Sequence, residues 1–314
     1  MKLSFVIPAY NEEHYIGDCL EAILREKATL PVEIAREIEI IVVNNASKDG
    51  TAAVVKKYAD KGVKLVDEQQ KGLVRARQAG YLASTGELIA NIDSDVRILP
   101  GWISRVLNEF ERDPKLVALS GPFIYFDAPR KVRFSTRVFY YIGYFFYLIN
   151  RFVFHVGSML QGGNFVVRRN ALDKIGGYNM DISFYGEDTD VARRMSKVGN
   201  VKFTFTLPVN ASGRRLVKEG GLTTGLRYAV NFFWMTFFAR PFTKDYNDIR
   251  PQEKGILAYT PPNRAKEWLI GTIFALIVLA FLGALGGGAY LIYLNATGDN
   301  HAATPTSPLV VPQP

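Results

Sequence analysis

Two aspartates, Asp93 and Asp95, stand one residue apart directly after the apolar run 88–92. A short apolar run of this kind is typical of a buried strand, and α/β sheets bind their ligands in the loops past the carboxyl ends of strands. Two carboxylates this close repel each other unless a cation lies between them, and a divalent metal ion that carries a diphosphate is a common solution. Because turns are also rich in Asp and Ser, the pair taken by itself fits a solvated turn equally well.

A second carboxylate pair, Glu187 and Asp188, lies between a glycine-rich loop at 176–178 and a segment with helical periodicity. The apolar residues of that segment, which we expect to face inward, are Val191, Met195 and Val198. Asp188 should then project from a helix N-terminus, where the backbone dipole favours the ionised form. An ionised carboxylate can act as a general base, although a helix cap without chemistry is the alternative.

Strands alternate with helices around these two pairs. Apolar runs predict strands at 3–7, 39–43, 63–66 and 88–92, with helices between them, one of which covers 52–59. Asn11 is placed to cap the first helix, whose apolar residues recur at helical spacing, namely Ile16, Cys19, Leu20, Ile23 and Leu24. This alternation predicts an α/β fold, with a doubly wound, mostly parallel sheet and helices on both faces.

The ordered motifs resemble those of the inverting glycosyltransferases of family 2, which have the GT-A nucleotide-sugar fold. The resemblance spans roughly the first two thirds of the chain and is carried by Pro8–Glu12, Asn44–Thr51, Gly72–Gly80, Asp93–Asp95, Gly162–Phe165 and Gly186–Asp188. It implies a catalytic domain over 1–215 that binds a nucleoside-diphosphate sugar and uses Mg²⁺ or Mn²⁺. The Gln-x-x-Arg-Trp motif of the family's processive members does not occur in the sequence, which favours transfer of one sugar or a few.

For the donor, the resemblance implies that Pro8, Tyr10 and Glu12 line the base-and-ribose pocket, although Pro8 also fits a simple turn. The family's second strand usually ends in an Asp that reads the base, and Asn44 stands at that place. Since an amide offers both a donor and an acceptor, the identity of the nucleobase stays open. Asp49 either shares this task or is a turn residue.

The resemblance also implies roles for the charged residues. Arg77 matches the family's Ala-Arg-Asn-x-Gly position and is expected to contact the nucleotide or the diphosphate, since arginine binds phosphate well. Asp95 would be the main protein ligand of Mg²⁺ or Mn²⁺, and Asp93 would contact the metal or the ribose. Asp188 would be the base of the transfer, with Glu187 as its positioning partner.

Three further residues have two interpretations each. Asn164 lines the sugar pocket or belongs to the core. Arg214 and Arg215 steady the leaving diphosphate or lie on a solvated basic face.

Residues 268–294 contain no charged side chain. This stretch is longer than the roughly 20 residues that a helix needs to cross a bilayer, so the sequence predicts one transmembrane helix over 266–295 and a disordered tail over 296–314. The intervening residues 216–265 are expected to form an amphipathic, basic juxtamembrane region. The apolar run at the start of the chain is too short for a signal peptide.

The positive charge is concentrated beside the predicted membrane segment. Of the net charge of +8, +6 falls within 214–266, where ten Lys or Arg accompany four Asp or Glu. Positive flanks stay on the cytosolic side, so we expect a single-pass protein of the cell membrane with a cytosolic catalytic domain. This basic belt fits anionic lipid better than nucleic acid, which we do not expect as a partner. The single cysteine, Cys19, allows no disulfide within the chain and is consistent with a reducing compartment.

Two aromatic segments, 138–160 and 226–242, predict further contact with lipid, since aromatic helices with basic flanks favour the bilayer interface. Buried helices that cover the sheet are the alternative. The sequence as a whole predicts a membrane-anchored, metal-dependent, inverting glycosyltransferase with a polyprenyl-linked or other lipid-linked acceptor. A soluble or protein acceptor and a silent nucleotide-sugar-binding scaffold are the rival hypotheses. Intact Asp93, Asp95 and Asp188 argue against the scaffold.

Overall fold

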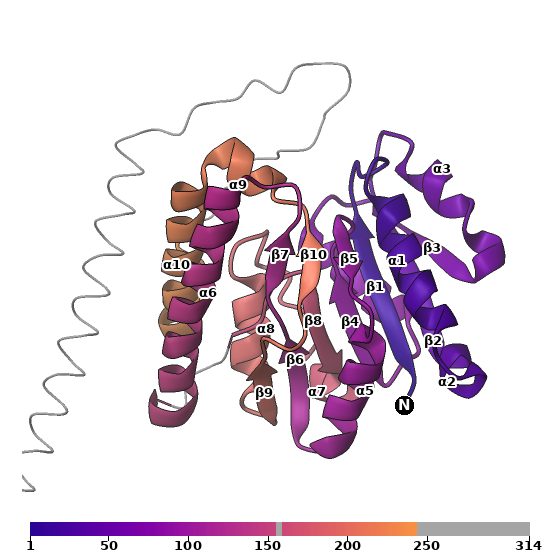
Figure 1. Ribbon diagram of the computed structural model, residues 1–314. Helices are drawn as coiled ribbons and strands as arrows, with labels where there is room; N and C mark the ends of the chain where they lie inside the picture. Colours follow the sequence, from indigo (N-terminus) through magenta and orange to yellow (C-terminus); the bar gives the residue numbers. More distant parts are fainter. Residues whose placement is uncertain (155–158, 244–314) are drawn as a thin grey trace, which may run out of the picture. The chain divides into compact units, whose positions relative to one another are not determined.

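The computed structural model describes residues 1–154 and 159–243 of the 314-residue chain (Figure 1). The chain divides into two units, Met1–Pro262 and Asn263–Pro314, and all the described residues belong to the first. The predicted transmembrane helix at 266–295, the tail at 296–314 and the part of the juxtamembrane region from 244 to 265 lie outside the described residues. Within the described ranges, no helix combines the length and the hydropathy that crossing a bilayer requires.

A seven-stranded sheet forms the centre of the described chain, in the order β3-β2-β1-β4-β8-β6-β9. Its strands are β1 (Leu3–Ala9), β2 (Ile38–Asn45), β3 (Val63–Glu68), β4 (Leu88–Ile92), β6 (Leu116–Ser120), β8 (Asn164–Arg168) and β9 (Asn200–Phe203). Strands β1 to β4 pair in parallel, β8 runs antiparallel to both β4 and β6, and β6 pairs in parallel with β9. The predicted α/β fold with a mostly parallel sheet is therefore confirmed.

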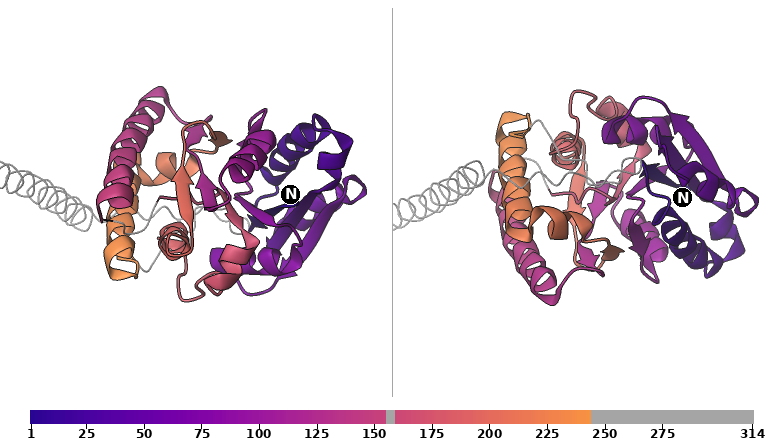
Figure 2. Two further views of the ribbon diagram at one scale, coloured as in Figure 1. Left: turned by 90° about the horizontal axis from the view of Figure 1, so that it is seen from below. Right: turned by 90° about the horizontal axis from the view of Figure 1, so that it is seen from above.

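Helices cover both faces of this sheet (Figure 2). They are α1 (Ile16–Ala28), α2 (Val32–Arg36), α3 (Thr51–Lys56), α4 (Leu73–Ala83), α5 (Trp102–Arg112), α6 (Arg130–Ile149), α7 (Arg169–Lys174), α8 (Glu187–Met195), α9 (Arg214–Glu219) and α10 (Gly221–Phe238), with a 3₁₀ turn η1 (Ala59–Lys61) and a π-helical turn η2 (Asn150–Phe154). Phe5 of β1 packs in one core cluster with α1 and α5, whereas its neighbour Val6 packs in a second cluster with α4 and α8. This alternation is the one expected for a strand between two layers of helices.

A second, three-stranded sheet joins β5 (Val96–Ile98), β10 (Val209–Ala211) and β7 (Phe123–Tyr125), in the order β5-β10-β7. Strand β5 begins directly after Asp95, and Val96 stands opposite Ala211 of β10 in an antiparallel register. The chain after Ala211 leads into α9, so this pairing brings the start of α9 to the Asp93–Asp95 loop.

Three local predictions are wrong. Helix α3 ends at Lys56 instead of 59, because the chain turns into η1, which Gly62 closes at φ +81°. Helix α8 ends at Met195, so Val198 lies beyond it and is 37% exposed instead of facing inward. Asn11 does not cap α1; it adopts φ +51°, and its side chain accepts a hydrogen bond from the backbone N–H of Lys48 at 2.8 Å.

Helices α6 and α10, which carry the two aromatic segments, lie side by side (Figures 1 and 2). Phe146 of α6 and Phe233 of α10 are both buried and pack edge to face, with 5.4 Å between their ring centroids. The facing sides of the two helices therefore belong to the protein core. Cys19 is also fully buried, as its place on the apolar side of α1 predicts.

Candidate functional site

The turn at Gly162 and Gly163, just before β8, is the meeting point of the two predicted carboxylate pairs. Gly163 has φ +84°, and a Cβ atom added there would collide with the carboxylate of Asp93. A Cβ atom on Gly162 would lie 3.2 Å from carboxylate oxygens of both Glu187 and Asp188. Because these glycines lack a side chain, carboxylates that are more than 90 residues apart in the sequence approach one spot at the carboxyl end of β4.

Arg77 connects the two pairs from the inner face of α4. Its fully buried guanidinium bonds to Asp93 Oδ1 at 3.1 Å and forms an ion pair with Glu187 Oε1. The guanidinium carbon also lies 5.2 Å from the ring centroid of Phe165 on β8. We expected this side chain to meet a nucleotide or diphosphate, but in the structure it is directed at the protein's own carboxylates. A direct donor contact by Arg77 stays a prediction.

Asp188 lies in the first turn of α8, as predicted. Its Oδ2 accepts a hydrogen bond from Gly162 N–H at 2.9 Å, and its Oδ1 accepts one from Thr189 N–H at 2.8 Å. Burial nevertheless raises the pKa of Asp188, because the loss of solvation outweighs these hydrogen bonds, so the helix N-terminus does not by itself set its charge. A carboxylate with a raised pKa accepts a proton more readily, which suits a general base.

Glu187 shares the same enclosed surroundings. Burial, reinforced by the negative charge of Asp188, raises the pKa of Glu187 to about 7 against the opposing effect of Arg77. The direction has a simple physical cause, since Asp93, Glu187 and Asp188 surround a single guanidinium and a proton relieves their repulsion.

A second arginine, Arg214, connects Glu12 with the predicted metal ligand Asp95. Its guanidinium forms an ion pair with Glu12 Oε1 and lies 3.1 Å from Asp95 Oδ2, while the ring centroid of Tyr15 is 4.5 Å away. The predicted pocket residue Glu12 and the predicted metal ligand thus belong to one cluster, and Arg214 is the member that holds them together.

Asp127 holds the loop that carries Arg214, a role that the sequence did not reveal. Its carboxylate accepts hydrogen bonds from Ser212 Oγ at 2.6 Å and from Gly213 N–H at 2.5 Å. Ser212 and Gly213 follow β10 directly, so Asp127 fixes the start of α9. An Asp 85 residues earlier in the chain gives no local signal of this contact.

At the end of β2, Asn44 donates from Nδ2 to Asp67 Oδ1 at 2.7 Å, and the two residues stand opposite each other in the β2–β3 register. The strand end that carries Asn44 therefore also presents a carboxylate from the next strand, which sequence reasoning did not include.

Tyr10 contacts another residue that sequence reasoning missed. The Nζ atom of Lys71 lies 4.0 Å from the centroid of the Tyr10 ring.

Asn45, which was also missed, shapes this same edge of the sheet. Its Oδ1 accepts from Gly72 N–H at 2.7 Å and its Nδ2 donates to the carbonyl oxygen of Gln70 at 2.8 Å. These bonds set the start of α4, which carries Arg77.

Two candidates with alternative interpretations have structural roles. Asn164 is fully buried; it accepts a hydrogen bond from Trp102 Nε1 and donates to the carbonyl oxygens of Gly121 and Leu207, so it belongs to the core. Asp49 accepts hydrogen bonds from Thr51 and from Glu13 N–H, as a turn residue does.

Two other candidates lie within secondary structure. Pro8 is buried within β1 opposite Val43. Arg215 forms an ion pair with Glu219 one turn along α9 at 2.8 Å. Binding of donor groups by either residue stays a prediction.

The chemistry of the predicted metal ligands fits a hard divalent cation. Asp93 and Asp95 offer only carboxylate oxygens, and Mg²⁺ or Mn²⁺ commonly uses one or two such groups together with phosphate oxygens and water. In the described ranges, no group of three or more His, Cys, Asp or Glu residues is arranged to hold a metal ion by itself.

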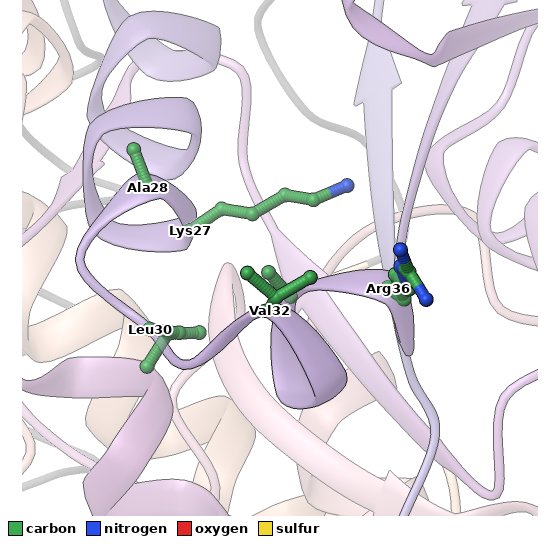
Figure 3. A pocket seen from close by; sticks show the side chains of 6 residues that line it. Lys27, Ala28, Leu30, Val32 and Arg36 are labelled. Carbon is green, nitrogen blue, oxygen red and sulfur yellow. The ribbon is translucent and has the colours of Figure 1, made fainter.

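A separate hollow of about 340 Å³ lies between the end of α1 and α2, where Lys27, Val32 and Arg36 are among the lining residues (Figure 3). It lies near the amino ends of the strands, since Lys27 Nζ donates to the carbonyl oxygen of Ile38, the first residue of β2. The carboxylates lie at the carboxyl ends. This hollow is therefore no part of the candidate site.

The model of glycosyl transferase family 2 matches residues 4–176, which is more than half of the chain and includes β1 to β8. The chain belongs to this family. Putative glycosyltransferase EpsH of Bacillus subtilis is 33% identical over 117 residues, which are 37% of this chain and 32% of that protein. Dodecaprenyl-phosphate galacturonate synthase of Rhizobium johnstonii is 31% identical over 116 residues, 36% of this chain and 33% of that protein. The matched part thus spans about a third of the length of these relatives.

Solved structures share the fold at low sequence identity. The mannosyltransferase PcManGT from Pyrobaculum calidifontis, solved with GDP-Man and Mn²⁺, has a TM-score of 0.59 at 18% identity and covers 96% of this chain and 80% of its own. S. aureus TarS 1–349, solved with UDP-GlcNAc, has a TM-score of 0.52 at 18% identity, covering 74% of this chain and 67% of its own. The described chain therefore has a GT-A-like fold.

Proposed function

We propose that this protein is a glycosyltransferase that inverts the anomeric configuration as it moves a sugar from a nucleoside diphosphate to a lipid-linked acceptor, most simply a polyprenyl one, at a membrane. The observation that carries the proposal is the convergence of Asp93, Glu187 and Asp188 at the Gly162–Gly163 turn. A donor diphosphate beside Asp93 and an acceptor beside Asp188 would then lie on opposite sides of the reacting carbon. In-line displacement requires this arrangement.

Asp188 is the base of the proposed reaction. It takes the proton of the acceptor hydroxyl or phosphate while the acceptor oxygen attacks the anomeric carbon from the face opposite the diphosphate. Arg77 joins Asp93 to Glu187, the residue before the base, and the N–H group of Gly162 donates to Asp188 itself. Asp93 and Asp95 would hold Mg²⁺ or Mn²⁺, which when bound neutralises the charge of the leaving diphosphate.

The donor would lie along the carboxyl ends of β1, β2 and β4, with Tyr10, Glu12 and Asn44 nearest its nucleoside. Arg214, whose guanidinium lies 3.1 Å from Asp95, would bind the diphosphate, since a guanidinium group binds phosphate oxygens as well as carboxylate oxygens. The solved neighbours were crystallised with GDP-Man in one case and UDP-GlcNAc in the other, so they do not select a base.

The names of several relatives support a lipid-linked acceptor. Besides the dodecaprenyl-phosphate enzyme, a dolichyl-phosphate beta-glucosyltransferase of Trichomonas vaginalis is 43% identical over 98 residues, 29% of this chain and 28% of that protein. We further propose that the catalytic domain lies on the cytosolic face of the cell membrane, with 266–295 as its single crossing, because the positive charge at 214–266 favours that side.

Replacing Asp188 by Asn tests the proposed base. Asp188→Asn keeps the size of the side chain but removes its ability to accept a proton at neutral pH. Transfer should fall by about 10²–10⁴-fold, the usual contribution of a general base, while donor affinity measured by calorimetry is retained. Asp181→Asn is the matched control, because Asp181 is an exposed carboxylate in the loop that precedes α8.

Nuclear magnetic resonance of the product should show the anomeric configuration opposite to that of the donor. Transfer by Asp188→Asn at nearly the wild-type rate, or a product with the configuration of the donor, would refute the mechanism and leave the family assignment intact.

A further inference from the structure

Helix α6 has one buried side that explains its place in the fold. Tyr140, Phe146 and Tyr147 are all buried, and Tyr140 stacks on Phe203 of β9 with 6.2 Å between ring centroids. Phe146 packs against α10. A surface helix with such a side normally presents polar residues to the solvent on the other.

The opposite side of α6 is apolar as well. Its large apolar side chains are between 41% and 70% exposed, and they are Phe134, Val138, Tyr141, Ile142 and Phe145. Their spacing of i, i+4, i+7, i+8 and i+11 places them on one stripe, here named the α6 outer face. Helix α5 shows the ordinary pattern, since within this described helix no large apolar side chain is exposed. A contiguous exposed stripe of this kind marks a surface that binds something apolar.

The charges of α6 indicate what it binds. The first two turns carry four exposed cations, Arg130, Lys131, Arg133 and Arg137, and the helix sequence contains no acidic residue. Aromatic side chains with adjacent Lys and Arg favour the interface of an anionic bilayer. A second copy of this face fits less well, because α6 offers no acidic residue to pair with these cations.

Helix α6 lies close to the proposed catalytic base. Tyr140 donates from its hydroxyl to Gln161 Oε1 at 2.7 Å, and the next residue, Gly162, donates to Asp188. The helix thus separates its outer face from the loop beside the proposed base by one helix diameter, about 10 Å.

We infer that the α6 outer face docks onto an anionic lipid bilayer and brings the base region to the membrane surface. If Asp188 is the base that activates a lipid-linked acceptor, as proposed above, this docking delivers the acceptor. The test below measures docking without any transfer, so either proposal can fail while the other stands.

The test uses the full chain with an environment-sensitive fluorophore on Phe145→Cys, since native Cys19 is fully buried and does not compete for the label. Vesicles of phosphatidylcholine with phosphatidylglycerol should shift the emission at position 145 to shorter wavelength, and added salt should weaken the shift. The matched position is Leu82→Cys on α4, which is also exposed and should show no shift. If residues 266–295 were the only membrane anchor, the label at position 145 would stay in water and its emission would not shift.

Charge variants measure the electrostatic part of docking. Arg133→Gln with Arg137→Gln should lower the docking equilibrium about thirtyfold, since each basic residue near an anionic surface contributes about 1 kcal/mol. Lys56→Gln with Lys57→Gln removes two exposed cations from the end of α3 and should have little effect.

Three outcomes would overturn the inference. They are an unshifted label at 145, an equal shift at 82, and a shift at 145 that is already present without vesicles. The last would mean that a second copy or the chain's own segment 268–294 covers the face.

Discussion

Two arginines at the carboxyl end of β4 each connect two carboxylates, yet their surroundings differ. Arg77 joins Asp93 to Glu187, and its side chain is 1% exposed. Arg214 joins Asp95 to Glu12, and its side chain is 15% exposed. The two clusters therefore use the same chemistry on alternate residues of one loop, with a fully buried arginine in one and a partly exposed arginine in the other.

The difference in burial assigns different tasks to the two clusters. A guanidinium on the inner face of a helix cannot exchange its carboxylates for a ligand without a large loss of solvation and pairing energy. A guanidinium at the start of a helix, held by a loop that Asp127 fixes, can replace a carboxylate by a phosphate oxygen. Under the proposed mechanism we therefore expect Arg77 to act as a positioning residue and Arg214 to be the arginine that contacts the donor.

The largest effect should follow from removing the buried arginine. Arg77→Met leaves Glu187 buried beside Asp93 and Asp188 without a counter-charge, which should lower the free energy of unfolding by about 3–5 kcal/mol. Urea denaturation measures this change. Arg214→Met is the comparison. It also removes a counter-charge from the buried Glu12, but the loss of stability should be smaller, because the side chains of Arg214 and Asp95 are 15% and 18% exposed.

A double variant shows whether the loss comes from the uncompensated charge. Adding Glu187→Gln to Arg77→Met should recover part of the stability, because an amide does not need a counter-charge. Equal losses for Arg77→Met and Arg214→Met would remove the distinction between the clusters.

The second effect concerns binding. Arg214→Met should weaken the affinity for a nucleoside diphosphate by roughly 10- to 100-fold, the usual contribution of hydrogen bonds to a charged group. The affinity for the matching nucleoside should change little, since the lost contact is to phosphate. Calorimetry with both ligands gives the two values.

Arg215→Met separates this role from that of the neighbouring arginine. Because Arg215 pairs with Glu219, its replacement should affect diphosphate affinity much less. The reverse ranking of the two variants would assign the diphosphate to Arg215.

The strands and the carboxylates could be predicted from the sequence, because both leave local signals. An unbroken apolar run such as 88–92 indicates a buried strand, and the acids that follow it lie at the ligand-binding edge. The contacts that hold the two arginines in place leave no such signal. Arg77 pairs with Glu187, which is 110 residues away, and the loop that carries Arg214 is held by Asp127, which is 85 residues from Ser212.

Side-chain direction was the other missing information. The sequence could not decide whether Asn164 faces a pocket or the core, because that depends on Trp102 and on two carbonyl groups from other elements. The same holds for Asp49. Whether its carboxylate contacts the nucleobase or stabilises a turn depends on the position of Glu13, whose backbone N–H donates to it.

The smallest effect is a pH dependence that belongs to the Arg77 cluster. Burial raises the pKa of Glu187 from an ordinary 4.5 to about 7. Between these two pH values the folded protein holds a proton that the unfolded chain has released. The contribution of Glu187 to stability is therefore fully present below pH 4.5 and is lost as the pH rises towards 7, with a slope of at most about 1.4 kcal/mol per pH unit.

Glu187→Gln isolates this contribution, since glutamine keeps the shape of the protonated side chain and does not titrate. Urea denaturation from pH 5 to 8 should give a wild-type free energy of unfolding that falls more steeply with pH than that of the variant. Some slope should remain in the variant, because the pKa of Asp188 is raised in the same direction. Parallel curves for the two proteins would mean that Arg77 neutralises Glu187 fully, and that the buried cluster holds no extra proton.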